Sequence, residues 1–471
     1  MVRLLLILLA DVILVAWGIS ASADVIFIIL MVVWVHYMAY SGYKLESRVL
    51  MFAFGISFFV FLLGREFLEQ YQLYEPDDTF KASTNECVYL CMILSLLSIW
   101  AMYSYMLCRF RPKHNIQRDL LIADSSFNVN KVRHFSLIAF YATYPFSIIY
   151  NVVIAIFVAR SGYHSYYIDF SSVLAGSSLL YLISKLELVM ESAFYIFLAS
   201  LPNKKQFKKP ALFYVFYLVM SLGSGQRSTF LLGLMLLFIF FVFMNGLQPF
   251  DGWFKRKYIF YSVVAFPIVA VGASLFNAWR FDVAISEINF WRSFGNFFYE
   301  QGVTSYVIKR AYDLEASIPP NIYTLEFIHS GLLAQLFGFD VYHGNTVEHA
   351  VQGGSFTHAL GYTVMDKAYL AGGGTGSSYI AELFYDFGYV GVILGSMLYG
   401  WIFSKINNVQ NGSIFKRAVV FICITKLLWA IRASFTGFLS YMFAPTTIVL
   451  LLFVFLSSKK HSVGRLRPNK L

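Results

Sequence analysis

Arginines at the ends of apolar stretches are the first residues in this chain that suggest chemistry. Arg227 lies in Gly223-Ser224-Gly225-Gln226-Arg227-Ser228, a break between two apolar stretches. Its glycines permit a tight turn, and a helix starting near Ser228 would direct the positive end of its dipole at the same space. Because a guanidinium can bind phosphate through two parallel hydrogen bonds, the pattern predicts an anion site, with Arg227 as the clamp and Gly225 close to the ligand.

Three further arginines at span ends are expected to bind the same anion: Arg280, Arg292 and Arg432. The alternative is that such side chains extend to the lipid headgroups. For Arg65 and Arg160 the headgroup interpretation is the expected one.

A glycine-rich segment, Gly372-Gly373-Gly374-Thr375-Gly376-Ser377-Ser378, precedes a second apolar stretch. Gly374 and Gly376 permit close approach of the backbone to a substrate, and Ser377 is expected beside it or capping the next helix. Glu382 falls in the first turn of that helix and is a candidate catalytic acid. No Lys-Ser or Lys-Thr follows the glycines, so this is not a P-loop. The alternative is a flexible loop re-entering the membrane.

Histidines supply a candidate base. His343, His349 and His358 lie within one polar segment, near acidic residues, and their spacing matches no zinc motif. We therefore expect no metal and no other cofactor. His358 lies closest to the glycine-rich segment and is the predicted general base, because imidazole titrates near neutral pH. If His358 is not the base, a carboxylate replaces it: Glu300, Asp366 or Glu382.

Composition defines the setting of these residues. The 471 residues are 58% hydrophobic and 13% charged, with a mean hydropathy of +0.64, which excludes an ordinary soluble domain. The net charge of +10 comes from basic residues grouped beside apolar stretches, as in the cytoplasmic loops of membrane proteins, so no nucleic acid is expected. Three charges, Lys185, Glu187 and Glu191, lie within one stretch and either pair with one another or mark a polar cavity.

The expected fold is all-α: a polytopic membrane protein with about twelve transmembrane helices and one large periplasmic loop that contains short helices. Basic residues fall in alternate gaps between the spans, which places both termini in the cytoplasm. The predicted division is a membrane domain over 1–276, a periplasmic cap over 277–385, and a membrane domain with a basic tail over 386–471. The expected spans are 3–19, 24–40, 48–64, 86–108, 135–159, 175–199, 210–223, 228–246, 258–276, 386–404, 418–434 and 438–457.

Two segments resemble the bacterial O-antigen polymerase family of the Wzy type: Gly223 to Arg227, and Gly372 to Gly391. The resemblance implies a glycosyltransferase of the bacterial inner membrane that works at the periplasmic face and joins repeat units carried on undecaprenyl diphosphate. It implies no metal and no nucleotide sugar, and Arg227 and Glu382 match family positions. The implied partners are undecaprenyl-diphosphate-linked glycans, membrane lipids and a polysaccharide chain-length regulator.

Three other classes share parts of this pattern. An O-antigen ligase has the same layout and similar chemistry. A lipid-linked oligosaccharide flippase would place its charges deep in the spans, as at Glu187, but does not need a long outer loop. A membrane O-acyltransferase would need a histidine within a span, where His36 is the one candidate.

Overall fold

The computed structural model describes residues 2–18, 21–109, 126–162, 165–166, 169–224, 227–248, 252–255, 257–258, 261, 264, 266–272, 289–407 and 413–460. Across these residues the regular secondary structure is helical and contains no β-strand, which confirms the all-α prediction. Gly225 and Arg280, two of the predicted site residues, lie outside the described residues.

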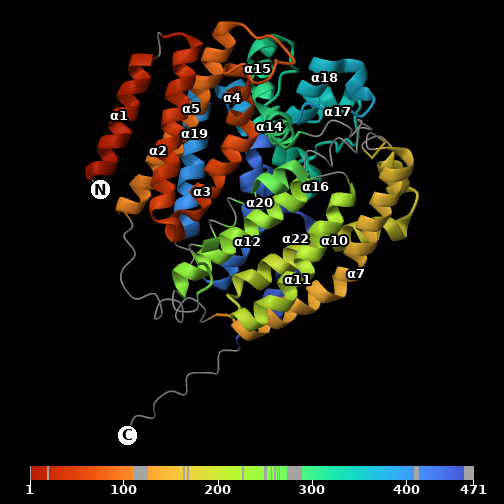
Figure 1. Cartoon of the computed structure of the whole chain (residues 1–471). Helices are drawn as coiled ribbons and strands as arrows, with labels where there is room; N and C mark the ends of the chain where they lie inside the picture. Colours follow the sequence, from red (N-terminus) through yellow and green to blue (C-terminus); the bar gives the residue numbers. More distant parts are fainter. Residues whose placement is uncertain are drawn as a thin grey trace.

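The long helices form two groups, one at the left of Figure 1 and one at the lower right, and the short helices of the cap lie at the upper right above the second group. In the first group α19 packs along α5, and α2 packs on α5 and on α3. The helix formed by α3 continues through a π-helical turn, η1, into α4. This group consists of α1 (Val2–Gly18), α2 (Ala23–Tyr43), α3 (Leu45–Phe58), η1 (Phe59–Leu63), α4 (Gly64–Gln70), α5 (Ala82–Arg109) and α19 (Tyr379–Asn407).

In the second group α10 packs along α7 and against α20. Side chains of Asn128, Asn203 and Ser413 accept backbone N–H groups at the starts of α7, α11 and α20, which fixes where these helices begin. The group consists of α7 (Val129–Ser161), α9 (Phe170–Ala175), α10 (Ser178–Ala199), α11 (Lys204–Ser221), η2 (Leu222–Ser224), α12 (Ser228–Leu247), α20 (Ile414–Trp429), η8 (Ala430–Arg432), α21 (Gly437–Met442) and α22 (Pro445–Ser457).

Six of the described helical segments are long and apolar enough to cross a membrane: 23–43, 45–70, 82–109, 129–161, 228–247 and 379–405. Shorter apolar helices cover Ile7–Gly18 and Pro445–Ser457. A multi-pass membrane protein is therefore supported, whereas the number of twelve spans stays a prediction. The predicted ninth span, 258–276, lies largely outside the described residues.

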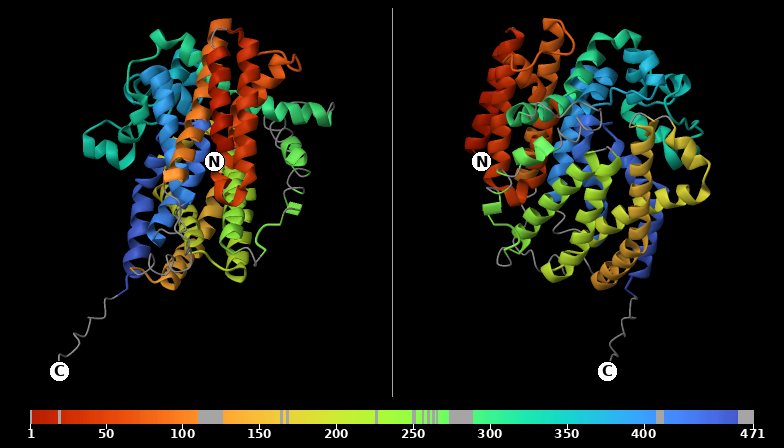
Figure 2. Two further views of the ribbon diagram at one scale, coloured as in Figure 1. Left: turned by 90° about the vertical axis from the view of Figure 1, so that its left-hand side faces the viewer. Right: turned by 45° about the vertical axis from the view of Figure 1, so that its right-hand side comes forward.

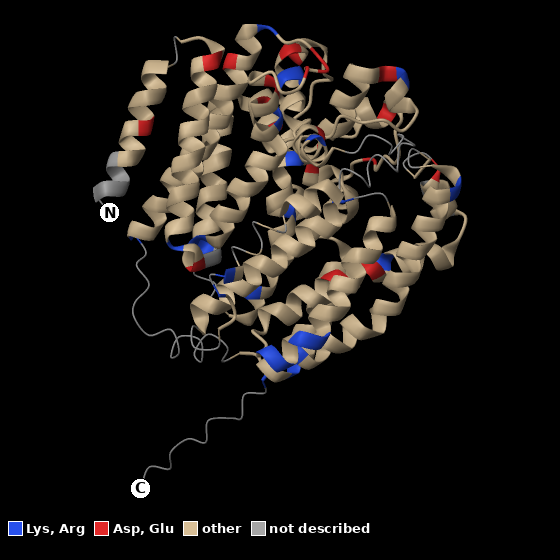
Figure 3. Cartoon of the chain, in the orientation of Figure 1, with Lys and Arg blue, Asp and Glu red and all other residues tan. Residues whose placement is uncertain are grey.

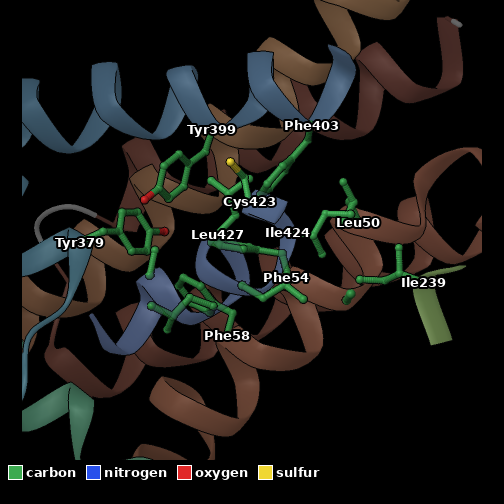
Figure 4. Close-up of a cluster of buried hydrophobic side chains, with 14 of the residues drawn as sticks. Leu50, Phe54, Phe58, Ile239, Tyr379, Tyr399, Phe403, Cys423, Ile424 and Leu427 are labelled. Atoms are coloured by element: carbon green, nitrogen blue, oxygen red, sulfur yellow. The ribbon is translucent and has the colours of Figure 1, made fainter. Parts of the chain in front are cut away.

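An aromatic and aliphatic core joins the two groups (Figure 4). Phe61 of η1 lies edge-on to the Trp429 ring of α20, with ring centroids 5.2 Å apart. Burial of such side chains away from water and lipid fixes the relative position of helices that come from both ends of the chain. The labelled core residues are Leu50, Phe54, Phe58, Ile239, Tyr379, Tyr399, Phe403, Cys423, Ile424 and Leu427.

Residues 289–378 form the cap, and the prediction of short helices there is confirmed. Its first helix, α14, lies crosswise to the long helices of the first group (Figure 2, left). The cap comprises α14 (Phe290–Gln301), α15 (Thr304–Asp313), η5 (Glu315–Ser317), η6 (Tyr323–His329), α16 (Gly331–Phe337), α17 (Val347–Gln352) and α18 (Phe356–Leu370).

Two buried cations fasten the cap to α4. Lys309 of α15 lies 2.8 Å from Glu66, and both side chains are at most 4% exposed. Arg65 binds Glu69 at 2.7 Å and Asp77 at 2.8 Å, and its guanidinium stacks between two tyrosine rings of the cap. The expectation that Arg65 extends to lipid headgroups was wrong, because these partners from α4, the following loop and the cap enclose it.

Candidate active site

Arg227 stands immediately before α12, which begins at Ser228 as predicted. Its Nη1 atom lies 3.3 Å from Oε2 of Glu300, near the C-terminal end of α14. The Arg227 side chain is 12% exposed and that of Glu300 26% exposed. The break between η2 and α12 therefore places this guanidinium beneath the cap, where it is largely shielded from solvent but still accessible to a ligand.

Arg432 reaches the same end of α14 from a different part of the chain. It belongs to η8, and its Nη1 donates to the backbone oxygen of Gln301 at 3.1 Å and to the Gln301 Oε1 at 3.2 Å. The partial negative charge of a helix C-terminus attracts such a cation. Arg227 and Arg432 thus contact consecutive residues, Glu300 and Gln301, although they are far apart in sequence.

Arg292 lies at the opposite end of α14 and does not join them. Its side chain is exposed, and its backbone oxygen accepts from the hydroxyl of Tyr74. Since a helix rises about 1.5 Å per residue, Arg292 stands roughly 12 Å along the axis from Glu300. Of the arginines predicted for the anion site, the described structure brings together Arg227 and Arg432.

A cavity of about 380 Å³ adjoins η8, and we call it the basic cavity. Trp429 and Ala433, which flank η8, contribute to its wall. The guanidinium carbon of Arg432 lies 5.8 Å from the centre of the Trp429 ring. The wall of the basic cavity also includes Lys426, Ser434, Ser440 and Tyr441.

Lys426 is a cation that the sequence analysis did not assign to the site. Its Nζ lies 5.0 Å from the centre of the Tyr441 ring, on the wall of the basic cavity. A lysine within an apolar helix is costly unless it faces a polar space. That rule is the sequence signal that could have identified Lys426.

Glu382 lies in the first turn of α19, as predicted, and is fully buried. The Ser377 hydroxyl donates to its Oε1 at 2.6 Å, and the backbone N–H of Phe435 donates to its Oε2 at 2.8 Å. Both carboxylate oxygens are thereby engaged inside the protein. Glu382 fixes the turn that follows Arg432, so the geometry fits a positioning residue better than a group that touches substrate.

The glycine-rich segment is held in place by the cap. The Asn345 side-chain amide donates to the backbone oxygens of Tyr369 and Gly373, each at 2.7 Å. Gly376 adopts φ of +77°, a conformation that favours glycine, and the space around the Gly374 α-carbon is open. Gly374 thus remains a candidate for close backbone approach to a substrate, whereas Ser377 directs its hydroxyl to Glu382.

A second cavity of about 270 Å³ lies within the cap, and we call it the histidine cavity. Its lining includes Glu326, His329, Ser330, Tyr342, His349 and His358. The rings of His349 and His358 stack with centroids 3.6 Å apart. His343 also lines this cavity, so the three predicted histidines come together in space.

The hydrogen bonds define which nitrogen of each ring carries a proton. His349 Nδ1 lies 2.8 Å from the backbone oxygen of Gly344, which can only accept, so Nδ1 donates. The Tyr369 hydroxyl donates to the backbone oxygen of Thr346, so His358 Nδ1, 2.8 Å from that hydroxyl, also donates. Burial, with a contribution from His349, lowers the pKa of His358 to about 4, and the imidazole is neutral at pH 7.

The two cavities share a wall. Ser330 lines the histidine cavity, and its hydroxyl lies 3.3 Å from that of Ser440, which lines the basic cavity. Glu326 interacts with the hydroxyls of Ser355 on the cap side and Ser434 on the basic-cavity side. Glu326 could not be identified from the sequence, because this residue lies in an irregular 3-10 segment with no motif around it.

The histidine pair makes cap stability dependent on pH. The folded pKa of His358, about 4, lies below the ordinary value of 6.5, and that of His349 is also lowered. The unfolded state therefore binds more protons between these values, so stability is full above pH 6.5 and falls toward pH 4. We expect a lower melting temperature at pH 5 than at pH 7.5 in detergent. In His358→Gln the drop should be smaller, and an equal drop in both proteins would contradict the assignment.

Intramembrane carboxylates form a polar cluster that adjoins the basic cavity, since the Tyr441 hydroxyl donates to Glu191 Oε2 at 3.3 Å. The Tyr217 hydroxyl lies 3.0 Å from Glu187 Oε1 and 3.1 Å from Glu191 Oε1, and Asn151 donates to Glu187 at 3.1 Å. Among the described residues, the ion pairs do not include Lys185, which lies over the Tyr181 ring. The described ion pairs therefore do not join these three charges to one another, and the polar cavity stays a prediction.

A protein-family model matches nearly the whole chain. Residues 2–461 match the model of the family described as O-antigen polysaccharide polymerase Wzy. Comparisons with curated proteins and with solved structures gave no significant match. The family match covers nearly all 471 residues and includes the arginine break, the cap and the glycine-rich segment. The resemblance noted in the sequence is confirmed, and the chain belongs to the O-antigen polysaccharide polymerase Wzy family.

Proposed function

We propose that this protein polymerises undecaprenyl-diphosphate-linked oligosaccharide repeat units into O-antigen or a related surface polysaccharide, at the periplasmic face and without a metal. The growing glycan on its lipid is the donor, and one lipid-linked repeat unit is the acceptor. The observation that carries the proposal is the convergence of Arg227 and Arg432 beneath the cap, beside a cavity that contains Lys426.

The chemistry of the leaving group explains why cations are needed. When the bond between the anomeric carbon and the diphosphate breaks, negative charge develops on the diphosphate. Fixed positive groups in a shielded site stabilise that charge more strongly than water can. In this proposal Arg227 and Arg432 exchange their contacts with Glu300 and Gln301 for phosphate oxygens, and Lys426 neutralises the far side.

The acceptor binds in a different cavity from the donor diphosphate. Its sugar enters the histidine cavity, and one hydroxyl reaches the shared wall, where the anomeric carbon of the donor stands on the other side. Aromatic rings on the two cavity walls, among them Trp429, Tyr441 and Tyr342, offer apolar faces for sugar rings. The Gly374 backbone and the neutral His358 belong to the acceptor side. A chain-length regulator is proposed as a protein partner of the assembled enzyme.

The proposed topology places the cap in the periplasm. Groups of Lys and Arg lie at the lower ends of helices, whereas Asp and Glu gather mainly in the upper half, where the cap lies (Figure 3). We expect reporter fusions after residues 115, 206, 255, 410 and 465 to indicate cytoplasm and fusions at 75, 165 and 330 to indicate periplasm. A cytoplasmic signal at residue 330 would contradict the mechanism, since the substrates would be on the wrong side.

The experiment that tests the function is a lipopolysaccharide gel from a strain lacking this protein. Loss of the ladder, with one repeat unit left on the core, is the result expected for a polymerase. Loss of every repeat unit would instead indicate a ligase or a flippase. Unchanged ladders would contradict all three interpretations.

A further inference from the structure

We infer that Glu326 is the general base of the reaction, and that it stands between an acceptor-sugar subsite in the histidine cavity and a donor-diphosphate subsite in the basic cavity. The inference rests on the proposed polymerase function and extends it to a residue and to two substrate positions.

The Glu326 carboxylate has an unused acceptor. Its Oε2 is buried and has no hydrogen-bond partner among the described residues. An unpaired buried carboxylate oxygen costs free energy, so the Glu326 carboxyl is not fully satisfied by the surrounding protein. Glu326 lines the histidine cavity, and a sugar hydroxyl there can donate to its carboxylate.

Glu326 also lies at the boundary where the two substrates must meet. Ser355 contacts its carboxyl from the cap side, and Ser434 does so from the basic cavity. The Ser330–Ser440 contact closes the same wall beside it. A hydroxyl bound to Glu326 therefore lies near the wall of the basic cavity, which Lys426 also lines and which Arg432 adjoins through Trp429.

The volume of the histidine cavity suits a small part of the acceptor. Its 270 Å³ is slightly below the roughly 300–1,000 Å³ of pockets for drug-sized ligands. This space fits one sugar ring, whereas the rest of the repeat unit and its lipid must lie outside. The subsite thus selects the acceptor by its terminal sugar.

Other candidate bases fit less well. Glu382 is fully buried, and both of its oxygens accept hydrogen bonds. Glu300 is engaged with Arg227. His358 is neutral, but a conjugate acid with a pKa of about 4 makes it a weak acceptor of protons at neutral pH.

The surroundings of Glu326 favour a base that works nearer neutral pH. Burial raises the pKa of its carboxyl, while the hydroxyls of Ser355 and Ser434 act in the opposite direction. The titratable groups facing it are His329 from its own segment, Tyr342, His343, His349 and His358 from the rest of the cap, and Glu382 from α19. A carboxylate with a raised pKa takes up a proton more favourably than a carboxylate with an ordinary pKa.

The proposed step is balanced in atoms and electrons. The acceptor hydroxyl oxygen forms a bond to the anomeric carbon of the donor as the bond from that carbon to the diphosphate oxygen breaks. The electron pair of the broken bond leaves with the lipid diphosphate, which Arg227, Arg432 and Lys426 stabilise. The hydroxyl proton passes to the Glu326 carboxylate and then to solvent.

The test compares Glu326→Gln with Glu348→Gln in purified, membrane-reconstituted protein given undecaprenyl-diphosphate-linked repeat units. Glu348 is an exposed acid of α17, so its substitution is a matched control. We expect Glu326→Gln to lose about 10²–10⁴ in kcat with little change in KM, and Glu348→Gln to retain wild-type activity. Retention of more than a tenth of the wild-type rate by Glu326→Gln would overturn the inference.

A second variant separates a base from a structural role. Glu326→Ala opens space beside the cavity, and added formate can then supply the missing carboxylate. Restoration of polymerisation by formate supports a base, whereas a folded Glu326→Ala protein that formate does not restore overturns it. Because the wild-type protein is assayed in parallel, a wild-type chain that makes no polymer overturns the proposed function itself, and active wild type with active Glu326→Gln overturns this inference alone.

Discussion

Arg227→Lys is expected to reduce polymerisation about 100-fold while the protein remains in the membrane at normal abundance. The charge is kept, but an ammonium group cannot make the two parallel hydrogen bonds that a guanidinium makes to phosphate. Loss of one fixed donor to a developing negative charge typically costs on the order of 10²–10³ in rate. The measurement is the rate of polymer formation by purified variant and wild type at equal protein amounts.

The matched control is Arg160→Lys, which makes the same change at an exposed arginine in the last turn of α7. Its rate should equal that of the wild type. Arg432→Lys should behave like Arg227→Lys, since both guanidinium groups meet at the end of α14. Near-normal rates for Arg227→Lys would rule out a two-pronged clamp and leave the contact with Glu300 as a purely structural one.

Lys309→Met is expected to destabilise the protein by about 3–5 kcal/mol, because it leaves the buried Glu66 carboxylate without its counter-ion. Glu66 also accepts from the Tyr89 hydroxyl at 2.6 Å, so the lost cation disturbs a network that joins α4, α5 and α15. The expected result is a much lower melting temperature in detergent and a low amount of inserted protein.

Adding Glu66→Gln to the Lys309→Met variant should restore much of that loss. The amide oxygen still accepts from Tyr89, while no unpaired charge remains buried. The double variant thus separates the burial of a charge from general damage to the cap. If Lys309→Met melts at the wild-type temperature, this ion pair does not fasten the cap to α4.

Much of the helical layout could be predicted from the sequence, because lipid demands long apolar stretches and basic loops. The start of α12 at Ser228 and the place of Glu382 in a first turn followed from glycines and capping chemistry. These are local properties of neighbouring residues. They needed no knowledge of how distant segments pack.

The residues that depend on packing could not be predicted in the same way. Arg65 looks like any arginine at a span end, yet Tyr299 and Tyr306 of the cap enclose it. Glu326 has no motif, and its role follows only from two cavities built by separate segments. The partners of Arg432 at the end of α14 likewise depend on how the cap folds back over η8.

A polymerase of this kind must itself transfer glycan between lipid diphosphates. The most direct measurement uses purified protein in liposomes with undecaprenyl-diphosphate-linked repeat units and a chelator, and it quantifies polymer length and released undecaprenyl diphosphate together. We predict a ladder of products with one lipid diphosphate released for each unit added, and the loss of both signals in Arg227→Lys. A ladder formed equally well by Arg227→Lys, or no ladder and no released lipid diphosphate from the wild-type protein, would contradict the account.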